Sequence, residues 1–401
     1  MARHDVGNPK FYIDYLSDAN IKGQVKGVLN PDISEGSHMR HAEGYLPHLI
    51  GLNPTNYKTI PLTFDASGTL GKIRVEFGPS LSIVRETENN NPKLFFGYLA
   101  HNLESMGVGS GWLTAYSFDG GDAGTIDHTT YDNVQNSGAT HNGWSLMQFS
   151  PNEFSSPLLS VLDFTLAYWP DSGEEDKNII LGNVCFGEVF QMPHSPELRL
   201  SMTREYDGVK TQTTKGGSTL TQISYDGPSS WARMAAWEIS GGFPNEDSPW
   251  VHGPSRGRRI WELEYSYLPS HKAYNASSST ASLFPVNEME NSSNASDTET
   301  TNQGGTTVAD DGKIIHGYHD YYFETDGDFD WSGGFTMSES TFLTSVLNRT
   351  AGGAIPFIFQ PNGDDYTPQG FALCTIDQRS IKFTQVAYGV YSVKLKIREV
   401  W

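Results

Sequence analysis

The sequence predicts an all-β protein, in which a jelly-roll or β-sandwich module is joined to a second β-barrel or sandwich domain with one short helix. Three observations support this class. The 401 residues include 41 glycines and 21 prolines, which mark many turns. Charged residues make up only 18%, against ~25% in typical globular proteins. Short stretches with apolar residues at every second position recur along the chain, as half-buried strands require.

The N-terminal half is predicted to hold an arm and the first module. Residues 1–45 are expected to form the arm, in which Phe11–Leu16 is a short aromatic strand. Residues 46–175 show strand patterns separated by turns, as in a β-sandwich of jelly-roll type. Residues 119–143 are predicted to be a polar loop. The strands expected in this module are 46–52, 72–77, 93–103, 111–118 and 159–169.

The second domain is predicted in two halves, residues 178–270 and 313–401. A Ser-, Asn- and Thr-rich insert over 271–312 separates them, and it is too polar to build a core by itself. The helix is predicted at 338–348, with an apolar face that ends before two glycines. The strands expected here are 178–190, 198–202, 258–267 and three closing strands between residues 354 and 401.

The last predicted strand alternates strictly. Residues 391, 393, 395 and 397 are apolar, and the residues between them are polar or basic. The chain then stops on Trp401 without a polar tail, so we expect this end to be docked in a sheet or an interface. We expect contacts between subunits to involve Phe357, Phe359, Tyr391 and Trp401.

The net charge of −20 disfavours nucleic acid and anionic membranes as partners, because both attract basic surfaces. No apolar run reaches the ~18 residues of a membrane span, and no secretory signal begins the chain. We therefore expect synthesis in a cytoplasm without secretion.

Motifs for catalysis or metal binding are not found in the sequence, so we predict no enzyme activity and no cofactor. Phosphate loops, zinc-spaced cysteines and nucleophile elbows are missing. Cys185 and Cys374 lie in apolar runs and are expected to be buried free thiols. Asp326–Asp330 and Asn362–Asp365 are interpreted as acidic turns rather than calcium sites. The histidine pair 316/319 is interpreted as surface or interface residues rather than metal ligands.

Aromatic side chains near loops leave two other functions open. Trp112, Trp144 and Trp250 could stack on sugars, although large aromatic residues more often fill cores or interfaces. A carbohydrate-binding or host-adhesion module is therefore the alternative function. A glycosidase would need two opposed carboxylates ~5–9 Å apart, and 47 acidic residues make chance pairs too common to indicate one.

Several stretches, in this order along the chain, resemble tail-associated structural proteins of tailed bacteriophages. They are Tyr98–Leu103, Leu181–Phe190, Arg258–Leu263, Pro356–Pro361 and the closing Gly389–Trp401. The resemblance implies a structural virion protein similar to distal tail or minor tail proteins, located at the tail tip, baseplate or an adaptor. It also implies a ring, commonly hexameric, with other copies and neighbouring tail-tube, baseplate or adaptor proteins as partners, and no catalytic residues. The insert over 271–312 departs from this pattern. The position in the virion therefore stays open, and a role as a head decoration protein is one of the alternatives.

Overall fold

The structure is a computed structural model of the whole chain. It describes residues 6–29, 39–41, 46–52, 60–64, 70–83, 93–101, 103, 110–117, 120–127, 143–156, 158–167, 177–198, 200–205, 209–223, 258–269, 307–308, 314–315, 342–366, 370–388 and 390–400.

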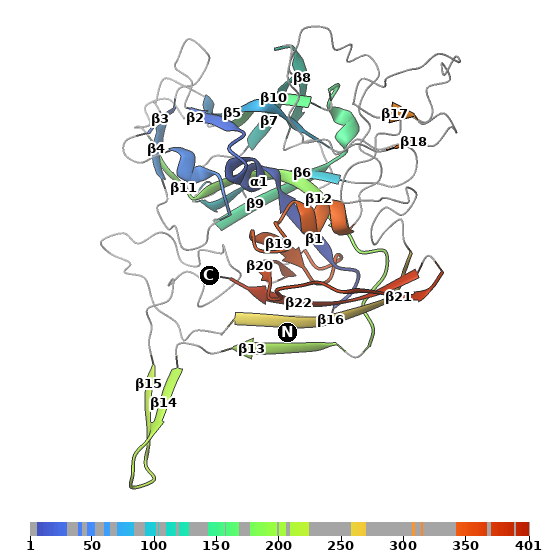
Figure 1. Cartoon of the computed structure of the whole chain (residues 1–401). Coiled ribbons are helices and arrows are strands. Elements are labelled where there is room, and N and C mark those ends of the chain that lie inside the picture. Colours follow the sequence, from blue (N-terminus) through green and yellow to red (C-terminus); the bar gives the residue numbers. More distant parts are fainter. Residues whose placement is uncertain are drawn as a thin grey trace.

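The largest sheet of the described residues has ten strands, in the order β13-β16-β22-β20-β19-β1-β12-β6-β9, and β21 pairs with β22 beside this path. In Figure 1 the sheet runs from β9 in the upper half of the body to β13 at its lower edge. Its strands are β1 (Lys10–Asp14), β6 (Lys93–His101), β9 (Gly143–Phe149), β12 (Asn183–Gln191), β13 (Ser201–Glu205), β16 (Arg258–Pro269), β19 (Phe357–Gln360), β20 (Ala372–Ile376), β21 (Phe383–Ala387) and β22 (Val390–Glu399).

A five-stranded sheet with the order β2-β5-β10-β7-β8 packs against the β12-β6-β9 end of the large sheet. Its strands are β2 (Val25–Leu29), β5 (Leu70–Ser82), β7 (Ser110–Ser117), β8 (Asp122–Asp127) and β10 (Leu158–Ala167). All pairings in both sheets are antiparallel. The predicted all-β class with a sandwich is confirmed.

The remaining elements are small. Strand β4 (Ile60–Phe64) pairs with β3 (Met39–His41) and with β11 (Lys177–Leu181). Strand β14 (Val209–Thr213) pairs with β15 (Thr219–Ile223), and β17 (Thr307–Val308) pairs with β18 (Ile314–Ile315). The helices are α1 (Tyr15–Ile21), the 3-10 helices η2 (Leu46–Leu49) and η3 (Pro151–Glu153), and the π-helix η7 (Phe342–Asn348).

The N-terminal strand β1 lies at the centre of the molecule. It is inserted between β12 and β19, which are more than 160 residues away in the sequence. Phe11 and Ile13 pack with apolar residues of β16, β19, β20 and β22. Tyr12 packs in a separate core on the other side of the sheet, and Tyr15 packs in the core of the sandwich. The predicted strand is therefore confirmed, but residues 10–21 do not form an arm, because strand β1 is fully buried between other strands.

A glycine allows the close packing of β1. A Cβ atom at Gly187 of β12 would lie 1.8 Å from the carbonyl oxygen of Ile13. Any larger residue would therefore push the two chains apart. This contact ties the N-terminus to the middle of the sequence.

The strand pairing also crosses the predicted domain boundary near residue 176. Strands β6 and β9 come from the predicted first module, and they continue the sheet of β12 from the predicted second domain. The division into domains at residues 46, 176 and 313 stays a prediction. Of the insert over 271–312, only β17 lies within the described residues.

Most predicted strands are present, and the helical face of η7 is confirmed because Phe342, Val346 and Leu347 are buried. Gly352 and Gly353 follow with φ angles of 74° and 90°, as expected for residues that end a helix. The closing region has four strands instead of three, because β21 pairs with β22.

Four details differ from the prediction. Residues 46–49 form a 3-10 helix rather than a strand, with Pro47 at its second position. The predicted loop 119–143 contains β8, which pairs with β7 and buries Ile126. Residues 178–190 form two strands in different sheets, β11 and β12. Alternation along the predicted strand 258–267 places Tyr267 on the same face as Tyr265, but Tyr267 is 72% exposed because β16 changes register between residues 265 and 268.

Candidate functional site

The outer face of the five-stranded sheet presents aromatic and polar side chains together. Strand β7 directs Leu113 and Ala115 into the core and leaves Trp112, Thr114 and Tyr116 partly exposed. This follows from the period of two along a strand. The neighbouring strands β5 and β10 place polar residues on the same face, because their apolar residues also point into the core.

An ion pair lies in the middle of this face. The cross-strand register places Arg74 of β5 beside Asp163 of β10, and Asp163 beside Thr114 of β7. Arg74 donates two hydrogen bonds to Asp163, Nε to Oδ1 at 2.8 Å and Nη2 to Oδ2 at 2.9 Å. The Asp163 side chain is 1% exposed and that of Arg74 is 21% exposed. A bidentate pair of this kind holds the guanidinium in one orientation.

Trp112 and Tyr116 flank the ion pair. They lie four residues apart on one strand face, a distance of ~13 Å at ~3.3 Å per residue. The guanidinium carbon of Arg74 is 6.0 Å from the centroid of the Tyr116 ring. The Thr114 hydroxyl is 3.1 Å from that of Thr125 on β8. The face therefore offers two flat apolar surfaces with hydrogen-bonding groups between them, and we call these residues the aromatic face.

Thr165 adds a hydrogen-bonding group at one end of the aromatic face. By register it lies between Lys72 of β5 and Trp112 of β7. Its side-chain hydroxyl is buried and has no hydrogen-bond partner within the described part of the chain. A buried hydroxyl without a partner costs free energy, and Thr165 itself is fully buried.

The β14–β15 hairpin is a second candidate site. Figure 1 shows it projecting downward, away from the body of the protein. Residues 210–222 are all exposed. The turn is closed by hydrogen bonds from the Gly217 amide to the Thr214 carbonyl at 2.9 Å and from the Thr214 amide to the Ser218 carbonyl at 2.8 Å. Gly217 has a φ of 81°, which glycine adopts without strain.

The predicted contact residues differ in their surroundings. Phe357 and Phe359 are fully buried in the core of one chain, where both rings lie within 5.5 Å of the Phe11 ring. Because the same chain already covers their side chains, they cannot themselves form a contact with another copy. Tyr391 is partly buried and packs against the same core. Trp401 lies outside the described residues.

The structure describes some of the cysteines, acidic turns and histidines that were considered as chemical sites. Cys185 and Cys374 are buried free thiols, as expected, and burial raises the pKa of each. Residues 362–365 form the predicted turn, closed by the Asp365 amide on the Asn362 carbonyl at 2.9 Å. The acidic stretch 326–330 and the histidines at 316 and 319 lie outside the described residues. Within the described ranges, no three His, Cys, Asp or Glu side chains are placed to share a metal ion.

A buried polar cluster connects α1, β12 and η7. Glu188 accepts hydrogen bonds from Tyr15 Oη at 2.9 Å and from Ser345 Oγ at 2.8 Å. Asp14 caps α1 and accepts from the amides of Leu16, Ser17 and Phe186. Burial nevertheless raises the pKa of Asp14 to about 6. Each of these contacts joins two elements of the fold, so we assign the cluster a structural role.

A second buried ion pair joins the neighbouring strands β16 and β22 of the ten-stranded sheet. Arg259 of β16 donates to both oxygens of Glu399 of β22, at 3.1 and 2.9 Å, and to the Phe371 carbonyl at 2.8 Å. Burial disfavours the charge on Arg259, but Glu399 outweighs this and holds the pKa of Arg259 above its usual value. This pair links β22 to β16.

Of the residues in the two candidate sites, only Trp112 was predicted from the sequence to contact a ligand. Residues 209–223 were not predicted as a hairpin, although threonines alternate on both sides of a Lys-Gly-Gly turn. Arg74 and Asp163 could not be paired from the sequence, because 89 residues separate them. Trp144 and Trp250 lie outside the described side chains.

Comparisons with known proteins do not identify a family. No protein-family profile matches the sequence, and no curated protein matches it significantly. Among solved structures, an α-L-arabinofuranosidase shows a TM-score of 0.22 and 12% identity over 47% of this chain and 27% of its own length. A mannan-recognising carbohydrate-binding module shows a TM-score of 0.22 and 12% identity over 46% of this chain and 98% of its own. A subviral particle of infectious bursal disease virus shows a TM-score of 0.18 and 15% identity over 38% and 37%.

These similarities are too weak to support an argument about ligands or activity. The chain spans about a quarter of the length of the arabinofuranosidase, 27%. No helix in the described ranges is long and apolar enough to cross a membrane.

Proposed function

We propose that this chain is a non-enzymatic structural protein of a tailed-bacteriophage virion, located at the tail tip, baseplate or an adaptor, where it assembles as a symmetric ring. The observation that carries the proposal is the β14–β15 hairpin, whose residues 210–222 are exposed and which projects from the body (Figure 1). An isolated two-stranded hairpin is only marginally stable in water. A hairpin of this kind gains stability when a partner covers it.

The residues that resemble tail proteins support the same proposal. Leu181–Phe190 falls largely on β12, Arg258–Leu263 on β16, Pro356–Pro361 on β19 and the closing stretch on β22. All four strands belong to the ten-stranded sheet. The resemblance therefore concerns one continuous structural unit, which would serve as a rigid support for assembly contacts.

Mass spectrometry of purified virions, with sedimentation analysis of the isolated protein, tests this proposal. We expect the chain in the virion at a fixed copy number and a closed oligomer in solution. A chain that is missing from virions and monomeric at every concentration would contradict the proposal.

The aromatic face favours a second candidate function, binding of a host glycan on the virion surface. Trp112 and Tyr116 would stack on sugar rings, and Thr114, Thr125 and the Arg74–Asp163 pair would contact hydroxyl groups. The partly exposed rings beside a fixed ion pair are the observation that supports it.

A glycan array compares Trp112→Ala with the unchanged protein. We expect the affinity for a bound glycan to fall about tenfold, or ~1.4 kcal/mol. Tyr267→Ala is the matched control, because Tyr267 is an exposed aromatic residue, 72% accessible, on a different sheet. Equal loss in both variants, or binding that persists in Trp112→Ala, would exclude the aromatic face as a glycan site.

A further inference from the structure

We infer that the β14–β15 hairpin is a cationic arm that docks on the acidic surface of a second copy of this chain. This inference rests on the proposed structural function and deepens it, since it names the contact element and its partner. It differs from the contact residues predicted in the sequence, two of which are buried in one chain.

The hairpin forms a sheet of its own. Strands β14 and β15 pair with each other and, within the described chain, with no other strand. Both outer edges of the hairpin therefore present backbone groups that no described strand covers. Exposed edges of this kind are where another chain adds or packs.

The two faces of the hairpin carry different side chains. The register pairs Thr211 with Thr221 and Thr213 with Thr219, so four threonines form one face. The other face pairs Lys210 with Gln222 and Gln212 with Leu220. Threonine favours extended strands, which keeps the arm straight without a core. Leu220 is 59% exposed and provides an apolar contact on the lysine face.

The hairpin and the whole chain differ in the sign of their charge. Lys210 and Lys215 are the only charged residues between positions 209 and 223, whereas the whole chain has a net charge of −20. The arm is therefore positive on a strongly acidic protein. Opposite charge steers association and selects partners.

A second copy fits these properties because it carries the same net charge of −20, opposite in sign to the arm. In a closed symmetric assembly, each copy contributes one arm and receives another, so no arm stays uncovered. The proposed contact thus needs no additional protein.

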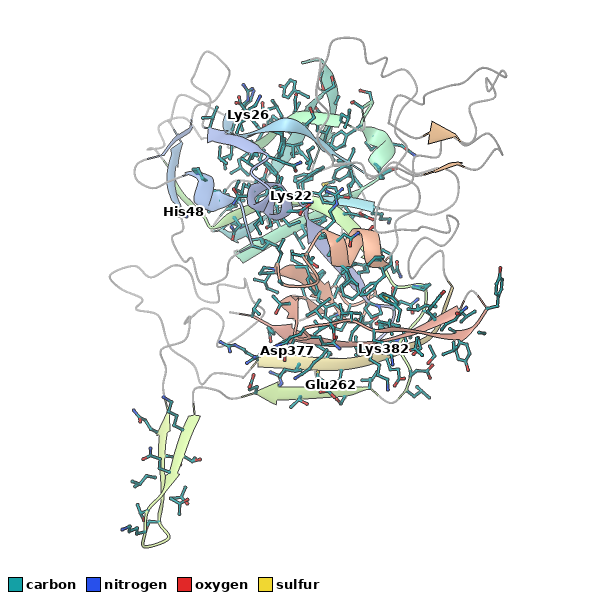
Figure 2. All side chains as sticks on the ribbon, viewed as in Figure 1. Lys22, Lys26, His48, Glu262, Asp377 and Lys382 are labelled. Atoms are coloured by element: carbon teal, nitrogen blue, oxygen red, sulfur yellow. The ribbon has the colours of Figure 1, made fainter. Side chains whose placement is uncertain are left out.

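Reversal of the arm charge tests the inference. The double variant Lys210→Glu/Lys215→Glu is compared with the matched control Lys26→Glu/Lys382→Glu. Lys26 and Lys382 are exposed on the body, away from the hairpin (Figure 2), and the control changes the net charge equally. Sedimentation velocity of the full chain, over a range of protein concentrations and at low and high salt, gives the dissociation constant for self-association.

We expect the unchanged protein to self-associate, and more weakly at high salt because salt screens exposed charges. The arm variant should dissociate at about tenfold higher concentration, since two weak surface attractions become repulsions. The control should change by less than about twofold.

Three outcomes would overturn the inference. An arm variant that associates as tightly as the unchanged protein would leave the structural function standing but exclude the arm as the contact. Equal weakening in both variants would show that net charge alone matters. A monomeric unchanged protein that binds another virion protein or nucleic acid through the arm would show that the partner is not a second copy.

Discussion

Strand β1 and the β14–β15 hairpin are short extended segments with opposite surroundings. Strand β1 has aromatic and aliphatic residues, and all five of its residues are buried. The hairpin has threonines at alternating positions, and residues 210–222 are all exposed. Both segments favour extended backbone. The comparison teaches that local propensity creates the strand in each case, whereas apolar side chains decide which strand enters the core.

The charged residues of the two segments also differ in their exposure to solvent. Around β1, Asp14 is buried and each of its oxygen atoms accepts hydrogen bonds, because an unpaired buried charge is costly. On the hairpin, Lys210 is exposed to solvent. A change in the first region should therefore affect folding, and a change in the second should affect association.

Phe11→Ala should have the largest effect on stability. The Phe11 ring lies 5.1 Å from that of Phe359 and 5.7 Å from that of Phe342. Its removal leaves a cavity at the centre of the sheet, so we expect a loss of ~3–5 kcal/mol in the free energy of unfolding. Chemical denaturation followed by circular dichroism measures it. A loss below ~1 kcal/mol would show that β1 is not central.

Arg259→Met should also destabilise strongly. The Glu399 carboxylate, 8% exposed, keeps the backbone amide of residue 259 as a donor but loses its charged partner. Breaking a buried pair in this way costs ~3–5 kcal/mol. The double variant Arg259→Met/Glu399→Leu removes both charges and should recover most of the loss. If the double variant is as unstable as the single one, packing rather than charge determines the effect.

Asp14→Asn should change how stability depends on pH. The ordinary pKa of this carboxyl is 3.8 and its folded pKa is about 6. Between these values the folded protein holds a proton that the unfolded chain has released, so this contribution is complete below pH 3.8 and is lost as pH rises through 6. The difference corresponds to ~3 kcal/mol.

Asparagine has no carboxyl group, so position 14 of the variant does not titrate in this pH range. The free energy of unfolding of the unchanged protein, relative to Asp14→Asn, should therefore fall between pH 4 and 7. The measurement is chemical denaturation of both proteins at several pH values. A difference that is constant over this range would show that Asp14 does not titrate there.

Leu220→Ser should have the smallest effect on stability. Leu220 is 59% exposed on the hairpin, and surface substitutions of this kind change stability by ~0.5 kcal/mol or less. The same denaturation experiment applies to dilute, monomeric protein. A loss above ~1 kcal/mol would mean that the hairpin packs on its own chain and is not a free arm.

Much of the secondary structure could be predicted, since alternation along a strand is a local property. Val393, Leu395 and Ile397, for example, lie on the apolar face predicted for the last strand and are buried. The insertion of β1 between β12 and β19 could not be predicted, because its partners lie far away in the sequence. Register between distant strands depends on the whole core rather than on local pattern.

The candidate sites were harder to predict for the same reason. Trp112 was selected as an aromatic residue, but the Arg74–Asp163 pair beside it exists only through the register of β5 and β10. The contact residues Phe357 and Phe359 were selected by their aromatic character, which indicates burial as well as it indicates an interface. Burial proved to be within one chain.

Hydrogen exchange of the backbone amides tests the central claim most directly, namely that β1 belongs to the folded core and β14–β15 is an assembly arm. The exchange rates are measured for dilute, monomeric protein and for the assembled protein. Amides of β1 should be protected in both samples, whereas those of residues 210–222 should exchange rapidly in the monomer and about tenfold more slowly after assembly. Hairpin amides that exchange at the same rate in both samples would contradict the account.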